Sequence, residues 1–548
     1  MKHRASSVAL VGLLSLVLFV PFLGSVRLFD WDEINFAEAA REMIVTGDYL
    51  HVHIDYAPFY EKPPLFIWAQ VVSMQMFGVN EFAARFPNAI VGAITMMVIF
   101  SIGRRFYDER FGWLWVIAYA GSLLPHFYFR SGIIDPMFNL FIFLGVYWML
   151  RAVDGDSVKY GAYAGLCAGA AVMTKGPVGL GLIGLTIAIG WLILRRNYSL
   201  PWRSTLAFMT VSVATSSIWF LIDYLQNGPT FVMENLAYQV RLLTTGDAGH
   251  EQPFWYHPVV VLIGCFPASM LLFGGLRSSA SESLQQRTMR IWMIVLMCVV
   301  LVVFSIVKTK IIHYSSMTYL PLTFLAAIFL HRWMAGAVRW RWWHTVTTIG
   351  MAAVWSVLAF VALWAFANSA WLMSLPTFRD PFLREALQRK VTWLGIEPYL
   401  GLLIVTGALL AWYVRRSGRH VASVVVLFGS VLVFVETLLP IIAPRIEPYT
   451  QGAALDFYEE LQGKNTYVQP LSMKSYAHLF YTRRTPELSA SARGLTQDAW
   501  QPWLLEGKLD RPAYFVCRIQ DAGQWRNHPN LREIRAEGGF VMFERIQP

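Results

Sequence analysis

Cysteine and charge are both scarce in this sequence of 548 residues. Of its four cysteines, Cys167, Cys265 and Cys298 fall within apolar runs and Cys517 stands alone, so no disulfide framework is predicted. Charged residues make up only 15% of the chain, against 56% hydrophobic residues. Because so little charge cannot cover that much apolar length in water, the composition excludes an ordinary soluble protein.

Internal repeats and low-complexity segments are not apparent in the sequence either. Secondary transporters typically combine inverted repeats with charged residues near the middle of the membrane. Here the charged residues gather at one end of the apolar runs, which makes a transporter the less favoured class. A purely structural membrane protein would not explain why lysines stand beside paired acids on that side.

Apolar runs of about 20 residues, the length of a membrane-spanning helix, are abundant. The first, Val8 to Val26, follows Lys2, His3 and Arg4, and because no small-x-small cleavage site comes after it we interpret it as an uncleaved anchor. The other predicted spans lie at residues 87–103, 112–129, 134–152, 160–174, 177–195, 205–225, 256–276, 290–307, 315–331, 343–368, 397–414 and 421–441. Together they predict about thirteen transmembrane helices.

Arginine and lysine fall in alternate loops between these spans, as in Arg104-Arg105 and Arg415-Arg416. Positively charged short loops stay in the cytoplasm, so the N-terminus is predicted inside and, with an odd number of spans, the C-terminus outside. The net charge of +10 is largely this topological signal. It does not indicate a nucleic-acid partner; the expected surroundings are membrane lipids.

The outer side carries two long loops and a soluble tail. The predicted division is a membrane domain at 1–444, with outer loops at 28–86 and 226–256, followed by a domain at 445–548. In the first loop, Ile34 to Val45 and the stretch after Pro63-Pro64 have the pattern of helices that lie in the membrane interface. In the tail, the pattern predicts a helix at 451–462 and strands at 466–468, 513–517 and 540–543. The expected fold is therefore a polytopic all-α membrane protein with a small outer α/β domain.

Charged side chains on the outer side form the candidate site, since lysine is unexpected there. The acids are Asp32, Glu33 and Asp135, and the basic or polar residues are Tyr60, Lys62, Arg130, Lys175, Arg241, Lys308, Lys310, His313 and Tyr314. Cations at a membrane interface bind phosphate oxygens through charge-assisted hydrogen bonds, so this set predicts a site for a phospholipid-like anion. The alternatives are that Asp32 caps a helix, Asp135 starts a span, and the lysines only reach toward headgroups.

A divalent metal such as zinc has candidate ligands in the outer loops, namely Glu61, His250 and His257. They could meet only if the two long loops fold together. The alternative is that both histidines are ordinary interface residues beside the aromatic pair Trp255-Tyr256.

Several segments of the chain also resemble one enzyme family. They are Trp31-Asp32-Glu33, Ala37 to Met43, Tyr60-Glu61-Lys62-Pro63-Pro64-Leu65, Asp135-Pro136, Thr174 to Pro177, Pro253 to Tyr256, and Lys308 to Tyr314. This pattern resembles the lipid A 4-amino-4-deoxy-L-arabinose transferases, which are C-type integral-membrane glycosyltransferases (GT-C) related to protein O-mannosyltransferases. The tail beyond about residue 445 has no matching motif.

The resemblance implies an inverting enzyme with thirteen membrane helices in the bacterial inner membrane, and with its active site and C-terminal domain in the periplasm. We expect it to be a monomer. The donor would be undecaprenyl-phosphate 4-amino-4-deoxy-L-arabinose and the acceptor a lipid A phosphate, with no cofactor required, and the product would confer resistance to polymyxin. The alternative is a transferase of the same superfamily that uses another polyprenyl-phosphate sugar and a protein or glycan acceptor.

In such a reaction two anionic phosphates approach one anomeric carbon, so cations in a dry site would contribute most. We assign Lys62, with Arg241 or Lys308, to the phosphates. Asp32 either positions the acceptor or stabilises positive charge on the sugar, Asp135 supports it or holds the sugar amine, and Glu33 belongs to the same acidic set.

Overall fold

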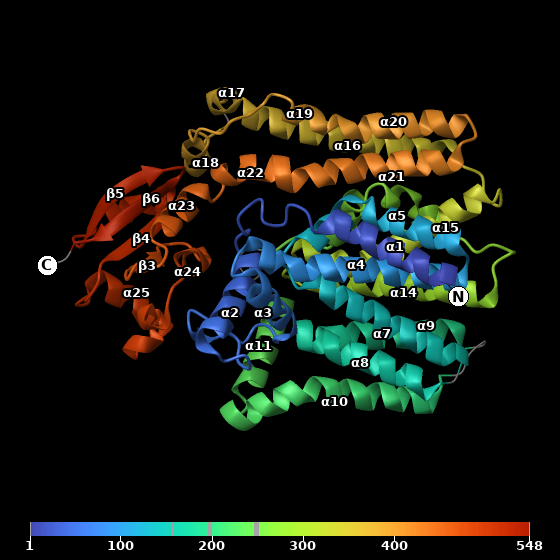
Figure 1. The fold of residues 1–548 in the computed structure, drawn as a ribbon, viewed down its shortest axis with the longest axis horizontal. Coiled ribbons are helices and arrows are strands. Elements are labelled where there is room, and N and C mark those ends of the chain that lie inside the picture. Colours follow the sequence, from blue (N-terminus) through green and yellow to red (C-terminus); the bar gives the residue numbers. More distant parts are fainter. Residues whose placement is uncertain (1, 156, 196–199, 246–250, 377, 547–548) are drawn as a thin grey trace.

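The computed structural model describes residues 2–155, 157–195, 200–245, 251–376 and 378–546. Most helices run side by side in one long bundle, with the C-terminal domain at one end and the N-terminus at the other (Figure 1). The bundle helices are α1 (Lys2–Phe19), α4 (Glu81–Phe106), α5 (Glu109–Ala120), α7 (Asp135–Gly155), α8 (Val158–Lys175), α9 (Val178–Leu194), α10 (Trp202–Asn227), α14 (Leu284–Ile306), α15 (Tyr319–Met334), α16 (Trp342–Ala367), α20 (Leu402–Arg416) and α21 (His420–Thr437).

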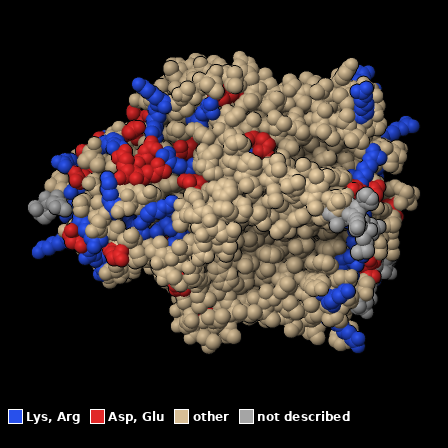
Figure 2. Space-filling model, in the orientation of Figure 1, with Lys and Arg blue, Asp and Glu red and all other residues tan. Residues whose placement is uncertain are grey.

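The surface of the bundle is apolar. Figure 2 shows charged residues at the two ends of the molecule and a broad uncharged surface between them. In α10 and α16 only 17% of the most apolar stretch is buried within the protein, so most of these side chains point outward. Such a surface is stable in lipid and not in water, and the chain is therefore an integral membrane protein.

Every predicted span contains a helix, and some spans are divided between two or three shorter helices. Within the described ranges, seven helices have the length and hydropathy of a membrane span, or eight if one bent pair is a single span. The count of thirteen therefore stays a prediction.

Two predicted spans are interrupted. The run at 256–276 folds as α12 (Tyr256–Gly264) and α13 (Ala268–Leu276), which are bent by 108° relative to each other. The break falls at Pro267, which lacks an N–H and disfavours helical geometry in the residue before it. The run at 112–129 likewise divides into α5, α6 (Leu123–Phe127) and η1 (Tyr128–Arg130).

The first outer loop contains the two predicted helices, α2 (Asp32–Thr46) and α3 (Leu65–Phe77), and a small hairpin of β1 (His53–Ile54) and β2 (Ala57–Pro58). The charged side of α2 does not face solvent as an interfacial helix would. Arg41 donates to Glu38 at 2.6 and 2.7 Å, and both side chains are buried. Glu42 accepts the backbone N–H groups of Asp55 and Tyr56, so these charges hold the hairpin on the helix.

The C-terminal domain is built on a four-stranded sheet in the order β3-β4-β6-β5. Its elements are β3 (Tyr467–Pro470), β4 (Ala513–Arg518), β5 (Leu531–Glu537) and β6 (Phe540–Arg545), with α23 (Gly452–Glu460), α24 (Ala477–Thr482), α25 (Gln497–Glu506) and α26 (Ala522–Arg526). The predicted helix and three strands are confirmed. The sequence missed β5 because, apart from its first residue, this edge strand has no fully buried position to give an apolar pattern.

Shorter elements connect these parts. They are α11 (Thr230–Thr244), η3 (Ile312–Thr318), α17 (Ser369–Ser374), α18 (Pro381–Ala386), α19 (Glu397–Leu400), η4 (Leu438–Ile442), α22 (Ala443–Ile446), η5 (Glu447–Tyr449), η6 (Pro486–Leu488), η7 (Ser491–Arg493) and η8 (Ile519–Asp521). Of these, α11 and η3 matter most here, because both border the candidate site.

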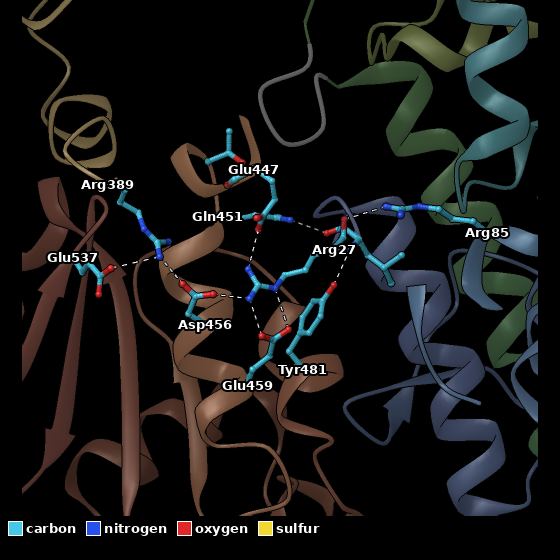
Figure 3. Close-up of polar contacts among 11 residues, drawn as sticks. Arg27, Arg85, Arg389, Glu447, Gln451, Asp456, Glu459, Tyr481 and Glu537 are labelled. Atoms are coloured by element: carbon cyan, nitrogen blue, oxygen red, sulfur yellow. Dashed lines mark hydrogen bonds and ion pairs between the residues drawn. The ribbon is translucent and has the colours of Figure 1, made fainter. Parts of the chain in front are cut away.

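A polar network fastens the C-terminal domain to the segment that follows α1 (Figure 3). Arg27 donates to both carboxylate oxygens of Glu459, at 3.0 and 2.7 Å, and to Asp456 at 2.5 Å. The backbone N–H of Leu28 donates to the Tyr481 hydroxyl at 2.8 Å. Because Asp32 lies only a few residues further along the chain, this network fixes the domain directly beside the start of α2.

Candidate functional site

One cavity brings together residues that the sequence analysis singled out. It has a volume of about 340 Å³ and lies where α2, the segment before α3, the end of α8 and η3 meet. Its lining includes Asp32, Lys62, Lys175, His313 and Tyr314. These residues come from four separate segments of the chain, so part of the predicted set lines one cavity.

Asp32 is the first residue of α2. Its carboxylate lines the cavity and does not cap the helix. The N-cap position is Trp31, and no side chain caps this helix. Instead, Asp32 Oδ2 lies 3.2 Å from His313 Nε2. Burial raises the pKa of Asp32, but the contact with His313 and the positive charges of Lys62 and Lys175 outweigh it and lower the pKa to about 2. Asp32 is therefore an anion at neutral pH.

A buried ion pair lies behind this contact. Lys175 donates to Asp135 Oδ1 at 2.7 Å, and the two side chains are 11% and 3% exposed. The ammonium group also lies 4.7 Å from the centre of the Tyr314 ring. Because its charge is paired inside the protein, Lys175 does not merely reach toward headgroups. His313 Nε2 is 3.7 Å from Asp135 Oδ2, so this imidazole stands between the two aspartates.

Lys62 supplies a second cation to the cavity, beside Tyr238 of α11. It donates to the Tyr238 hydroxyl at 3.2 Å and lies 4.5 Å from the centre of that ring. Glu61 is 3.9 Å away and also lines the cavity. These contacts hold the ammonium group without matching its full charge at close range, which suits a cation that receives a phosphate.

Glu33 does not play the catalytic role that the acidic pair suggested. Its oxygens accept from Arg85 at 3.0 and 2.8 Å, and from the backbone N–H groups of Gly132 and Phe29 at 2.5 and 2.9 Å. The side chain is only 4% exposed. Although Glu33 borders the cavity, all its acceptor capacity is used to fix the loop, so its role is structural.

Two predicted phosphate-binding cations are also occupied elsewhere. Arg130 donates to Glu436 at 2.6 Å and to the backbone oxygen of Pro21 at 2.8 Å. Lys310 donates to the backbone oxygen of Val307 at 2.7 Å and is buried. Neither lines the cavity, because each cation ties segments of the bundle together.

Three further predicted residues lie outside the cavity lining. Arg241 and Lys308 are exposed, and the guanidinium group of Arg241 lies 5.2 Å from the centre of the Tyr238 ring. Tyr60 packs edge-on against Phe231 and lines a separate cavity of about 480 Å³. Arg241 therefore contacts Tyr238, which does line the cavity.

The predicted metal ligands are not gathered at one point in the part of the chain that the structure describes. Glu61 lines the cavity, whereas His257 is fully buried and packs against Tyr256 and Phe304. His250 lies outside the described residues. No three His, Cys, Asp or Glu side chains within the described ranges are arranged to hold a metal. The metal site stays a prediction.

Sequence reasoning missed the residues that the C-terminal domain adds to the cavity. Lys474 and Tyr476 line the cavity, and the Lys474 ammonium lies 5.6 Å from the centre of the Trp31 ring. Both belong to the tail that matched no motif. Tyr238 was also missed, because a single tyrosine on an amphipathic helix has no distinguishing pattern.

Comparison with known proteins identifies similar sequences. Residues 61–220 match the model of a family described as dolichyl-phosphate-mannose-protein mannosyltransferase. The undecaprenyl phosphate-alpha-4-amino-4-deoxy-L-arabinose arabinosyl transferases of Pectobacterium atrosepticum and Edwardsiella ictaluri are each 27% identical, over 338 and 341 residues. Each alignment covers 61% of this chain and 60% of the relative, so the match spans about three fifths of those proteins. These relatives confirm the resemblance that the motifs indicated.

Two crystal structures share the fold along almost the whole chain. They are ArnT from Cupriavidus metallidurans bound to undecaprenyl phosphate and the same protein in the apo state, each with a TM-score of 0.76 and 20% sequence identity. The alignments cover 98% and 99% of this chain and 98% of each crystallised chain. The architecture is thus the GT-C fold of these structures, including the C-terminal domain.

Proposed function

We propose that this protein is an inverting glycosyltransferase that moves 4-amino-4-deoxy-L-arabinose from undecaprenyl phosphate to a phosphate group of lipid A. The observation that carries the proposal is the single cavity in which a permanently charged aspartate faces two lysines. The 27% identical relatives, which are named as undecaprenyl phosphate-4-amino-4-deoxy-L-arabinose transferases, support the donor and the sugar. The alternating arginine loops support an inner-membrane enzyme whose cavity opens to the periplasm.

The donor phosphate binds at Lys62. This lysine belongs to the Glu-Lys-Pro-Pro segment that resembles the lipid A enzymes, and Tyr238 holds its ammonium group at the cavity wall. A phosphodiester leaving group gains negative charge as the sugar departs, so a nearby ammonium group lowers the barrier. Carrier lipid and cation also attract each other before reaction, so Lys62 contributes to donor affinity as well.

The transfer itself needs little base catalysis. An oxygen of the acceptor phosphate attacks the anomeric carbon, the bond from that carbon to the donor phosphate breaks, and undecaprenyl phosphate leaves from the opposite face with its electron pair. Asp32 is a weak base because its pKa is about 2. Its role is electrostatic: the carboxylate stabilises positive charge that develops on the sugar, and His313 holds it in place.

Asp135 and Lys175 support this arrangement from behind. Their 2.7 Å pair joins the start of α7 to the end of α8, and His313 packs beside Asp135. Because the charges of Asp135 and Lys175 cancel, this pair adds little net charge next to His313. Asp32 can then present its own negative charge to the sugar.

A related transferase with another sugar is the second candidate, and one observation favours it. The family whose model matches residues 61–220 is described by mannose transfer to protein. Purified full-length protein should therefore be tested with undecaprenyl-phosphate aminoarabinose and undecaprenyl-phosphate mannose, each offered with lipid A and with a serine- and threonine-containing peptide. Mass spectrometry should detect aminoarabinose on lipid A alone. Mannose transfer without aminoarabinose transfer would establish the second candidate instead.

A further inference from the structure

A second cavity opens between the first outer loop and the C-terminal domain. Its volume is about 640 Å³, within the range of small-ligand sites. Phe59, Lys474 and Tyr476 line both this cavity and the one that holds Asp32. We call the second cavity the domain cleft. Because the two share a wall, a molecule bound in the domain cleft can present one end to the transfer site.

The lining of the domain cleft is rich in neutral hydrogen-bonding groups. It includes the side chains of Gln469, Gln497, Gln501, Ser472, Ser475 and His478. Two buried atoms among them, Gln469 Oε1 and His478 Nδ1, have no hydrogen-bond partner in the structure, and His478 is only 3% exposed. Buried polar atoms are almost always paired, so these two have bonding capacity left for a ligand or for solvent in the cleft.

Aromatic rings border the same space. Trp525 and Tyr476 line the cleft, and the Trp525 indole N–H donates to Ser472 Oγ at 3.0 Å. Gln524 donates to the same oxygen at 2.6 Å, which fixes Ser472 and the indole relative to each other. Amides and hydroxyls beside fixed aromatic rings suit a ligand with many hydroxyl groups on a ring whose C–H faces are apolar.

The charges in the cleft narrow the ligand class. Asp55 is paired with Arg484 at 2.7 Å, so its carboxylate is already neutralised. Lys474 is the one lysine or arginine among the described residues that line the cleft, and it stands at the wall shared with the transfer site. The lining thus suits a neutral body that carries one anionic group at the end nearest Asp32.

We infer that the domain cleft binds the saccharide part of a phosphorylated glycan acceptor, and that Lys474 receives its phosphate. The inference rests on the proposed transfer function of the neighbouring cavity, and it gives the C-terminal domain a role in choosing the acceptor.

Direct binding tests the inference without the transfer reaction. Saturation-transfer NMR on the detergent-solubilised full chain should detect glucose 1-phosphate, which has both a sugar ring and a phosphate, at least tenfold more tightly than glycerol 1-phosphate, which lacks the ring. Gln501→Ala and Trp525→Ala should each weaken glucose 1-phosphate about tenfold. Gln388→Ala, an exposed glutamine outside the cleft lining, is the matched control and should bind as the parent does. Equal affinity for the two probes, or variants that bind like the parent, would overturn the inference.

Kinetics then separate this inference from the proposed function. Gln501→Ala should raise KM for the acceptor about tenfold while kcat and donor KM stay within twofold of the parent values. If the parent transfers sugar and the Gln501→Ala variant has the same acceptor KM, the cleft assignment is refuted and the proposed function is not. A protein that binds glucose 1-phosphate in the cleft but transfers no sugar would refute the function and support the cleft.

Discussion

Replacing Asp32 with asparagine separates the charge of this residue from its shape. The carboxylate is paired with His313 at 3.2 Å and faces the cavity, and its pKa of about 2 keeps it ionised throughout the physiological range. If that charge stabilises the transition state, its removal should lower kcat by a hundredfold or more, which corresponds to about 2.7 kcal/mol. KM for the donor should change little, because the sugar is uncharged at its anomeric carbon before reaction.

The same substitution should leave the fold intact. Asp32 is 33% exposed and makes no capping hydrogen bond to α2, so the stability lost with its ion pair should be about 1 kcal/mol or less. The loss of activity and the loss of stability are thus expected to differ by more than 1 kcal/mol.

The assay is transfer of aminoarabinose to lipid A by purified parent and Asp32→Asn enzymes, measured together with thermal unfolding in the same detergent. Asp30→Asn is a matched control, since Asp30 also lines the cavity but its carboxylate accepts the backbone N–H of Trp31 at 2.9 Å. A stable Asp32→Asn enzyme with full activity would refute the electrostatic role of Asp32. Loss of folding in step with activity would show that the carboxylate is structural.

Four other outcomes follow from the structure. Asp135→Asn should lower the free energy of unfolding by about 3 kcal/mol or more, because it leaves the buried Lys175 ammonium unpaired. The double variant Asp135→Asn with Lys175→Met should regain part of this stability. Unfolding measurements that find the single variant as stable as the parent would contradict this. Lys62→Ala should weaken donor binding about tenfold, measured as donor KM, since its phosphate partner is present before reaction as well; an unchanged KM would remove it from the phosphate site. Burial and a neighbouring arginine hold the pKa of His478 well below its usual value near 6.5, so on acidification the unfolded chain binds this proton before the folded chain does. The free energy of unfolding of the C-terminal domain should therefore be highest above about pH 6.5 and fall as the pH drops below that value. His478→Gln should reduce this pH dependence in unfolding curves. A reporter active only in the cytoplasm, fused after Pro548, should be silent, and activity there would reverse the proposed topology.

The elements of the membrane domain could be predicted because their physical cause is local. An apolar run long enough to cross a bilayer must form a helix, since lipid offers no partners for backbone N–H and C=O groups. The breaks at Pro267 and after α5 are harder to predict, because the hydropathy of an apolar run is the same whether the helix is straight or bent. The edge strand β5 was not predicted because most of its residues are exposed, so it has no apolar pattern to mark it as a strand.

The candidate site was predicted only in part, because sequence shows that a charge is out of place but not what it meets. Lys62 and Arg130 were both predicted to lie on the outer side of the membrane, yet one lines the cavity and the other is paired with Glu436. Lys310 similarly satisfies a backbone oxygen. Lys474 shows the converse case, in which a residue without any motif reaches the site through tertiary packing.

Exposure explains how the acids of this site divide their roles. Glu33 and Asp135 are 4% and 3% exposed, and each has a basic side chain within 2.8 Å, so their charges are spent on holding segments together. Asp32 is 33% exposed and its nearest partner is a histidine at 3.2 Å. Asp32 therefore differs from Glu33 and Asp135 in keeping an open face toward the cavity, and its position depends on the buried pairs around it. The proposed chemistry of Asp32 and the rigidity supplied by Glu33 and Asp135 belong to one arrangement, in which buried ion pairs set the position of the more exposed carboxylate.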